Sequence, residues 1–353
     1  MISFYPGPSK LNDSTGRFFQ EAIATGILSY NHRSPKFTSL MEETIFLLKE
    51  KLLVPENYTV FFVSSATECW EIIAQDLVQK SSVHLFNGNF GEKWMNLSKK
   101  LLEDVRCLRF GINNQIDTSH LIIPDACDLI ALTDNETSNG TCVTKDTLEA
   151  IRKMYPDKLI ASDATSSMAG VHLDFSLADV WFASVQKCFG LPSGMALMIC
   201  SPEAIKKAKM KESRHYNSIS SLAENISKYQ TTHTPNILNI FLLNKTLKER
   251  PDIISIDQII RQRADSWYSF FETMDNVELL ISNEDCRSKT VIVVQGTEDR
   301  IATLKLAAEK EGFVLGNGYG KWAKTTWRIA NFPAYTEEDI FKLKGFLRDF
   351  YQK

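Results

Sequence analysis

The chain lacks the features that mark membrane, secreted and nucleic-acid-binding proteins. Its apolar runs are far shorter than a membrane span requires. The N-terminus, from Met1 to Pro8, has neither the charged start nor the long apolar core of a signal peptide. The formal net charge is only −3, and the basic residues are dispersed rather than gathered in a stripe. We therefore predict a cytoplasmic protein with no membrane or nucleic-acid partner.

The cysteine and histidine patterns show no sign of a disulfide framework or a metal site. The seven cysteines are odd in number, and no two have Cys-x-x-Cys spacing. The six histidines do not pair at the spacing of metal ligands. Free thiols in a reducing compartment are the natural interpretation, and we predict no structural metal.

The periodicity predicts an α/β fold with a mainly parallel, seven-stranded sheet and helices on both faces. Short β-like runs alternate with helical stretches such as Cys69–Val78 and Thr147–Met154, and several of the runs are almost continuously apolar, as strands buried on both faces are. The expected strands are Thr59–Val63, Val83–Phe86, Val105–Phe110, Leu129–Leu132, Lys158–Ala161, Val180–Ala183 and Met195–Cys200.

A smaller α+β domain is expected after about residue 250. Its predicted elements are a helix (Ile256–Met274), a strand (Thr290–Gln295), a helix (Arg300–Lys310), a strand (Thr326–Ala330) and a last helix (Glu337–Tyr351). Residues 1–15 are expected to pack with it. The predicted division is therefore a large domain over residues 16–245 and a small domain formed by residues 1–15 and 246–353. The length of 353 residues suits such a pair.

Lys187 and Asp163 are the most informative residues. Lys187 follows the apolar run Trp181–Val185 and precedes a loop that contains Gly and Pro, while Asp163 ends the run Leu159–Ser162. A pyridoxal phosphate (PLP) site requires a Lys and an Asp at the ends of neighbouring strands. The Lys amine forms a Schiff base with the cofactor aldehyde, and the Asp keeps the pyridinium nitrogen protonated. On these two residues alone, an ordinary loop lysine remains an alternative.

Further candidates follow other predicted strands. Residues 64–68 (Ser-Ser-Ala-Thr-Glu) open a helix with capping-box spacing between Ser65 and Glu68, and their free N–H groups suit a phosphate, although a plain helix cap is the alternative. Phe90 could stack on a pyridine ring or simply pack in the core. Thr137 lies in a loop of turn formers and could bind the cofactor's phenolic oxygen.

Two arginines are candidates for binding an anionic substrate. Arg328 lies within an apolar strand, where a charge does not serve packing alone, and its planar fork suits a carboxylate. Arg33 lies in the loop Asn31–Pro35 before a helix, and a solvated surface residue is the alternative there.

Taken in order, these segments resemble the class V aminotransferases of fold type I. The resemblance runs from Pro6-Gly7-Pro8-Ser9 to Arg328-Ile329-Ala330-Asn331, and its most specific parts are Ser184-Val185-Gln186-Lys187 and Asp163. It implies a PLP-dependent transaminase that forms a homodimer with its sites at the subunit interface. By this resemblance, Lys187 would be the Schiff-base lysine and Asp163 the partner of the pyridinium nitrogen. Phe90 would stack on the cofactor ring, Thr137 would bind its phenolic oxygen, and Arg328 would bind the substrate α-carboxylate. The residues implied for the cofactor phosphate are Ala66, Thr67, Gln186 and, from the second subunit, Thr234.

For the substrate, different residues resemble different branches of the family. Length and the segment His32-Arg33-Ser34 are most similar to the phosphoserine aminotransferase branch, where such a pair crosses the dimer to the substrate phosphate. This implies transfer from O-phospho-L-serine to 2-oxoglutarate, in serine biosynthesis. Pro35, Thr67, His233 and the run Gly88–Trp94 favour the alanine–glyoxylate or serine–pyruvate branch instead.

Two other functions are alternatives to transamination. Sulfur removal from cysteine needs a reactive thiol on a mobile loop, and Cys286 is the only candidate, although its acidic neighbours would disfavour the thiolate. A non-catalytic binding protein on this fold is the other alternative, and intact Lys187 and Asp163 argue against it.

Overall fold

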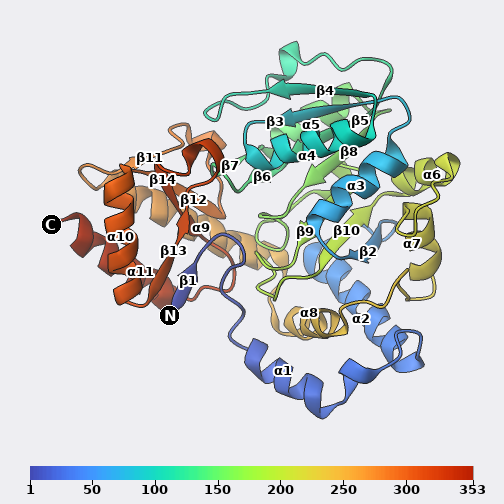
Figure 1. The fold of residues 1–353 in the computed structure, drawn as a ribbon, viewed down its shortest axis with the longest axis horizontal. Coiled ribbons are helices and arrows are strands. Elements are labelled where there is room, and N and C mark those ends of the chain that lie inside the picture. The colour runs from blue at the N-terminus through green and yellow to red at the C-terminus, as the bar shows by residue number, and fades with distance from the viewer. Residues whose placement is uncertain (353) are drawn as a thin grey trace.

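The predicted strands form one seven-stranded sheet in the computed structural model, which describes residues 1–352 (Figure 1). Along the sheet the order is β2, β10, β9, β8, β5, β3, β4. The bounds are β2 (Thr59–Val63), β3 (Ser81–Phe86), β4 (Asp104–Arg109), β5 (Cys127–Thr133), β8 (Leu159–Asp163), β9 (Val180–Ser184) and β10 (Ala196–Cys200). The prediction of a mainly parallel α/β sheet is confirmed, and the strand ends differ from those expected by up to two residues.

One strand, β10, runs against its neighbours. It pairs antiparallel with both β2 and β9, whereas the other pairs in this sheet are parallel. A parallel return requires a crossover that is usually helical, and residues 185–195 between β9 and β10 contain no helix. The chain instead turns back through Gly190 and Gly194, both at positive φ (66° and 104°). Lys187 lies in this turn.

Every residue of β8, β9 and β10 is buried, so both faces of the central sheet are covered. Helices α3 and α4 contact its strands and lie in front of it in Figure 1. The helices of this part of the chain are α1 (Thr15–Ala24), α2 (Pro35–Leu52), α3 (Ala66–Leu77), α4 (Asn89–Leu101), α5 (Lys145–Met154), α6 (Pro202–Lys211), α7 (Ile219–Ile226) and α8 (Ile237–Glu249), and a short hairpin joins β6 (Asn135–Glu136) to β7 (Thr141–Cys142).

A second sheet joins the N-terminal strand to strands from the C-terminal part of the chain, as Figure 1 shows on its left side. Its order is β1 (Ile2–Phe4), β13 (Phe313–Asn317), β14 (Thr326–Ala330), β12 (Val291–Gln295) and β11 (Glu278–Leu279). Helices α9 (Ile253–Glu272), α10 (Glu298–Lys310) and α11 (Glu337–Tyr351) accompany it. Strand β13 was not predicted, because Phe313-Val314-Leu315 is a very short apolar run between glycines.

The pairing of β1 with β13 supports the expected grouping of the N-terminal residues with the small domain. We propose that division for the chain, with its second boundary after α8, since residue 245 lies inside that helix. None of the helices among residues 1–352 has the length and apolar character needed to cross a bilayer.

The packing of β10 makes a measurable prediction about stability. Met198 is fully buried between Phe61 of β2 and Phe182 of β9. Met198→Ala should lower the free energy of unfolding by about 2–5 kcal/mol, because the lost contacts leave a cavity. Met210→Ala is the matched control, since Met210 is 68% exposed and its truncation should change stability by less than about 0.5 kcal/mol. Urea unfolding of the two variants would compare them, and equal losses would contradict this view of the sheet.

Candidate active site

The carboxyl ends of the parallel strands meet at one edge of the large sheet, and a cavity of about 230 Å³ lies there. Asp163 is the last residue of β8, and Lys187 follows β9, the neighbouring strand. The predicted site residues that line the cavity are Ala66, Thr67, Phe90, Thr137, Asp163, Gln186, Lys187 and Arg328. The structure therefore brings together side chains from segments that are widely separated in the sequence.

Lys187 is held by packing rather than by an ion pair. Its side chain is only 7% exposed, and Nζ donates a hydrogen bond to Thr137 Oγ1 at 2.7 Å. Gly7 lies against the aliphatic stem: at φ 142°, a Cβ on it would come within 3.0 Å of Lys187 Cε. Burial lowers the pKa of Lys187 to about 8, and the positive charge of Arg328 acts in the same direction. The amine is therefore easier to deprotonate than an exposed lysine.

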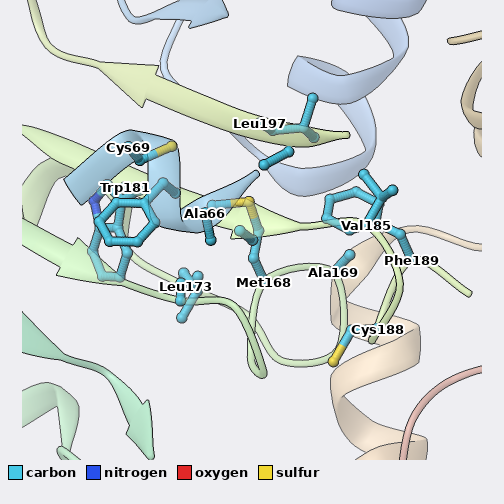
Figure 2. Close-up of a cluster of buried hydrophobic side chains, with 14 of the residues drawn as sticks. Ala66, Cys69, Met168, Ala169, Leu173, Trp181, Val185, Cys188, Phe189 and Leu197 are labelled. Atoms are coloured by element: carbon cyan, nitrogen blue, oxygen red, sulfur yellow. The ribbon is translucent and has the colours of Figure 1, made fainter. Parts of the chain in front are cut away.

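An apolar cluster fixes the turn that carries Lys187. Figure 2 shows Val185, Cys188 and Phe189, on either side of the lysine, among buried side chains that include Met168 and Ala169. Because well-packed interiors leave side chains little freedom, the backbone at residue 187 is closely constrained. The amine can then move only through rotation of its own side chain.

Asp163 is buried and receives two hydrogen bonds. Trp70 Nε1 donates to its Oδ2 at 3.3 Å, and the Thr165 amide donates to its Oδ1 at 3.0 Å. Burial raises the pKa of Asp163, while these donors and the charge of Lys187 lower it. A cation placed against this carboxylate would favour its ionised form. Trp70 and Thr165 were not singled out from the sequence, and their residue types gave no signal of this role.

The N-terminus of α3 opens onto the same cavity. Ser65 is the N-cap, and its hydroxyl accepts from the Glu68 amide at 3.1 Å. The expected capping box is incomplete, because the Glu68 carboxylate accepts from the Ser64 amide rather than from that of Ser65. Ala66 donates its amide to Ser184 Oγ at 3.0 Å. The amide of Thr67 is left without a partner among the described residues, and the positive dipole end of the helix suits an anion.

Two aromatic rings and an arginine form the side of the cavity toward the small sheet. The Phe90 ring stacks on Tyr319, with centroids 5.1 Å apart. Arg328, on β14, is 3% exposed and donates to the carbonyl oxygens of Asn317 (2.6 Å) and Thr137 (2.7 Å). Burial lowers the pKa of Arg328 to about 10, so it is still cationic at neutral pH. Tyr319 also lines the cavity and was missed from the sequence, since an isolated Tyr among glycines carries no functional pattern.

The remaining predicted residues, His32, Arg33 and Thr234, do not line this cavity. Arg33 and Thr234 are exposed. The pKa of His32 is lowered by partial burial and by the nearby charges of Arg33 and His233, which places the two loops close together. Asn31 Oδ1 accepts from the Arg33 amide at 2.8 Å, and Ser34 caps α2, so the loop has a defined shape. Within one chain these residues form a separate surface group.

Cys286 also lies outside the cavity. It is 1% exposed, and burial raises its pKa more than Asp285 does. The thiol therefore has neither the access nor the low pKa that sulfur transfer requires.

Comparison with known proteins identifies the family. The model for aminotransferase class-V matches residues 6–318. This chain belongs to the class-V aminotransferase family. As a member, it is a PLP-dependent aminotransferase.

Relatives of this class-V aminotransferase carry related names. A phosphoserine aminotransferase from Rhodococcus opacus is 25% identical, over 96% of this chain and 91% of its own length. The crystal structure of a phosphoserine aminotransferase from Cytophaga hutchinsonii has a TM-score of 0.93 and 32% identity, covering 99% of this chain and 98% of its own. An alanine–glyoxylate aminotransferase from Nostoc sp. shares the fold, with a TM-score of 0.83, 20% identity and coverage of 99% and 94%.

The cavity of this class-V aminotransferase fits PLP. It contains a buried carboxylate and a buried amine, and the hydroxyls of Thr133 and Thr165, which line it, are buried without a hydrogen-bond partner. Unmatched buried hydroxyls are uncommon in folded proteins. A polar ligand in the cavity would supply the missing partners.

The low pKa of Lys187 predicts how the protein without cofactor reacts with PLP. The neutral amine is the nucleophile, so the rate of covalent PLP capture should rise through a midpoint near pH 8, below the ordinary lysine range. Stopped-flow absorbance would follow capture between pH 6.5 and 10. Lys187→Ala is the control and should show no covalent capture at any pH. A midpoint above 10 would show that burial does not depress the pKa of this amine.

Proposed function

We propose that this class-V aminotransferase transfers the amino group of O-phospho-L-serine to 2-oxoglutarate, giving 3-phosphohydroxypyruvate and L-glutamate. The observation that carries the proposal is the resemblance over almost the full chain to proteins named phosphoserine aminotransferase, including a structure at 32% identity. The exposed Arg33 beside His32 supports it, because a guanidinium suits a phosphate. We further propose a cytoplasmic homodimer that works in serine biosynthesis, and the seven free cysteines support a reducing compartment.

The cavity residues are proposed to hold the cofactor as follows. The start of α3, at Ala66 and Thr67, would bind the phosphate together with Gln186 and, from the second subunit, Thr234. Phe90 would stack on the ring and Thr137 would bind the phenolic oxygen. When bound, PLP supplies a ring that accepts the electron pair left at the substrate α-carbon once its proton is removed.

The proton-transfer steps are proposed for side chains of this chain. Lys187 Nζ, which burial makes less basic, would remove the proton from the substrate α-carbon and deliver it to the cofactor carbon. Asp163 would hold a proton on the ring nitrogen throughout. Arg328 would orient the substrate through its α-carboxylate, which is common to every amino donor. The stacked rings of Phe90 and Tyr319 would exclude water from the reacting atoms.

Substitutions at the two buried charges test the chemical assignment. Lys187→Ala should abolish transamination with the fold intact. Asp163→Asn should still bind PLP but lose roughly 3 kcal/mol or more of barrier lowering, over a hundredfold in kcat, because an amide cannot hold the ring proton as a carboxylate does. Single-turnover absorbance with glutamate would measure both. Near-native turnover in Asp163→Asn would place the pyridinium partner elsewhere.

The substrate proposal predicts a selective defect. Arg33→Ala should lower kcat/KM for phosphoserine by roughly ten- to over a hundredfold, the cost of a charge-assisted contact of about 1.5–3 kcal/mol, and should leave glutamate and alanine almost unchanged. Lys36→Ala is a matched control, since it removes an exposed positive charge from the same surface. Equal losses on all donors, or faster turnover of alanine with glyoxylate than of phosphoserine, would favour the alanine–glyoxylate or serine–pyruvate type.

Mixed dimers would show whether Arg33 acts across the subunit interface. If it does, a dimer of one Lys187→Ala subunit and one Arg33→Ala subunit has both defects in one site and none in the other, so phosphoserine turnover should return to about half. If Arg33 served its own subunit, both sites would be defective and no activity would return.

A further inference from the structure

A second cavity, of about 300 Å³, lies where the N-terminal segment meets the connection between α8 and α9. No residue that lines it also lines the cavity around Lys187. Its wall is nevertheless close to that lysine. The Asn12 side-chain amide donates a hydrogen bond to the Phe189 carbonyl oxygen (2.8 Å), and the Asn12 backbone amide donates to the Gly190 carbonyl oxygen (3.0 Å). The cavity therefore lies behind the turn that carries Lys187.

The floor of this cavity is apolar. Phe18, Ile256 and Ile260 are buried at 2%, 6% and 1% exposure, while Ile259 is 41% exposed. Burial of apolar ligand surface here would be favourable by about 25 cal/mol per Å². The size is at the lower end of the range for small-molecule sites.

One of the charged side chains that line the cavity has no ion-pair partner within residues 1–352. Asp13 pairs with Lys10 at 2.8 Å, and Lys10 also pairs with Asp339 at 3.0 Å. Glu249 pairs with Arg17, and Arg263 pairs with Glu337 at 2.5 Å. Arg250, which connects α8 to α9, donates to the Ala169 carbonyl at 2.5 Å and has no carboxylate partner among the described residues. Among the described residues, the guanidinium of Arg250 is therefore the lining charge that makes no ion pair.

Unmatched hydrogen-bonding groups gather on the same wall. Arg250 Nε, Arg263 Nη1 and Thr246 Oγ1 are buried without a partner among residues 1–352, and all three side chains line the cavity. Most buried polar atoms in native proteins have partners, so three such groups at one cavity point to a missing ligand. Each of them can donate a hydrogen bond to an oxygen.

We propose that this cavity binds a small monocarboxylate with an apolar body, such as an aliphatic or aromatic acid. The carboxylate would neutralise Arg250 and accept hydrogen bonds from the arginine side chains, and the apolar body would cover Phe18 and the isoleucines. A neutral ligand would leave Arg250 uncompensated. A dianion would place its second charge over the apolar floor or near Asp13 and Glu249.

Isothermal titration calorimetry of the PLP-loaded enzyme with phenylacetate tests the proposal, with phenylacetamide as the uncharged probe of the same shape. Phenylacetate should bind saturably, and the amide should bind at least tenfold more weakly, because it lacks the charge that Arg250 requires. Absence of saturable phenylacetate binding, or equal affinity of the two probes, would overturn the proposal.

Two tryptophan variants of α9 locate the binding. Ile259→Trp should fill the cavity from its partly exposed position and weaken phenylacetate binding at least tenfold. Ile254→Trp is the matched control: Ile254 is 51% exposed on the same helix but does not line the cavity, so affinity should be unchanged. Arg250→Gln should also weaken phenylacetate binding at least tenfold. If Arg250→Gln fails to fold, the comparison of Ile259→Trp with Ile254→Trp decides whether this cavity binds phenylacetate. Unchanged affinity in Ile259→Trp would assign the binding to another site, such as the one at Arg328.

Discussion

The burial of one amine and one carboxylate at the ends of neighbouring parallel strands is the constraint on which this molecule depends. Taking Lys187 out of water lowers its pKa to about 8, and taking Asp163 out of water raises its pKa. Each charge favours the ionised form of the other, which partly offsets the cost of burial. The apolar cluster around Val185 and Phe189 keeps the two groups in place, so the core of the large sheet and the chemistry of the cavity are one structural unit.

The cavity also requires the second sheet. Arg328 comes from β14 and donates to the carbonyl of Thr137 in the large part of the chain, while Gly7, just after β1, packs on the stem of Lys187. Tyr319 covers Phe90 from the same side. Because the small sheet supplies the walls and the large sheet supplies the reacting groups, any shift between them would change the space available to a substrate. The second cavity, around Arg250, lies at this same junction.

Under the proposed function, the residues that carry out the reaction and those that select the substrate lie in different parts of the molecule. The groups proposed for proton transfer are buried and rigid, whereas Arg33 and Thr234 are exposed on loops outside the cavity of their own chain. Loops on a rigid scaffold can change without loss of the fold. Structures named for phosphoserine and for alanine and glyoxylate share the fold with this chain, at TM-scores of 0.93 and 0.83, so the fold alone does not set the substrate.

Local sequence pattern is enough to predict the large sheet, the family and the main buried charges. Continuous apolar runs reveal strands buried on both faces, and a Lys or Asp just beyond such a run must lie at the sheet edge, so Asp163 and Lys187 could be found from local pattern. Only the tertiary structure placed Trp70 against Asp163, Tyr319 against Phe90 and Gly7 against Lys187. It also revealed the short strand β13 and the uncompensated charge of Arg250. These depend on which distant segments meet, and no local periodicity encodes a contact between residues separated by 93 positions or more.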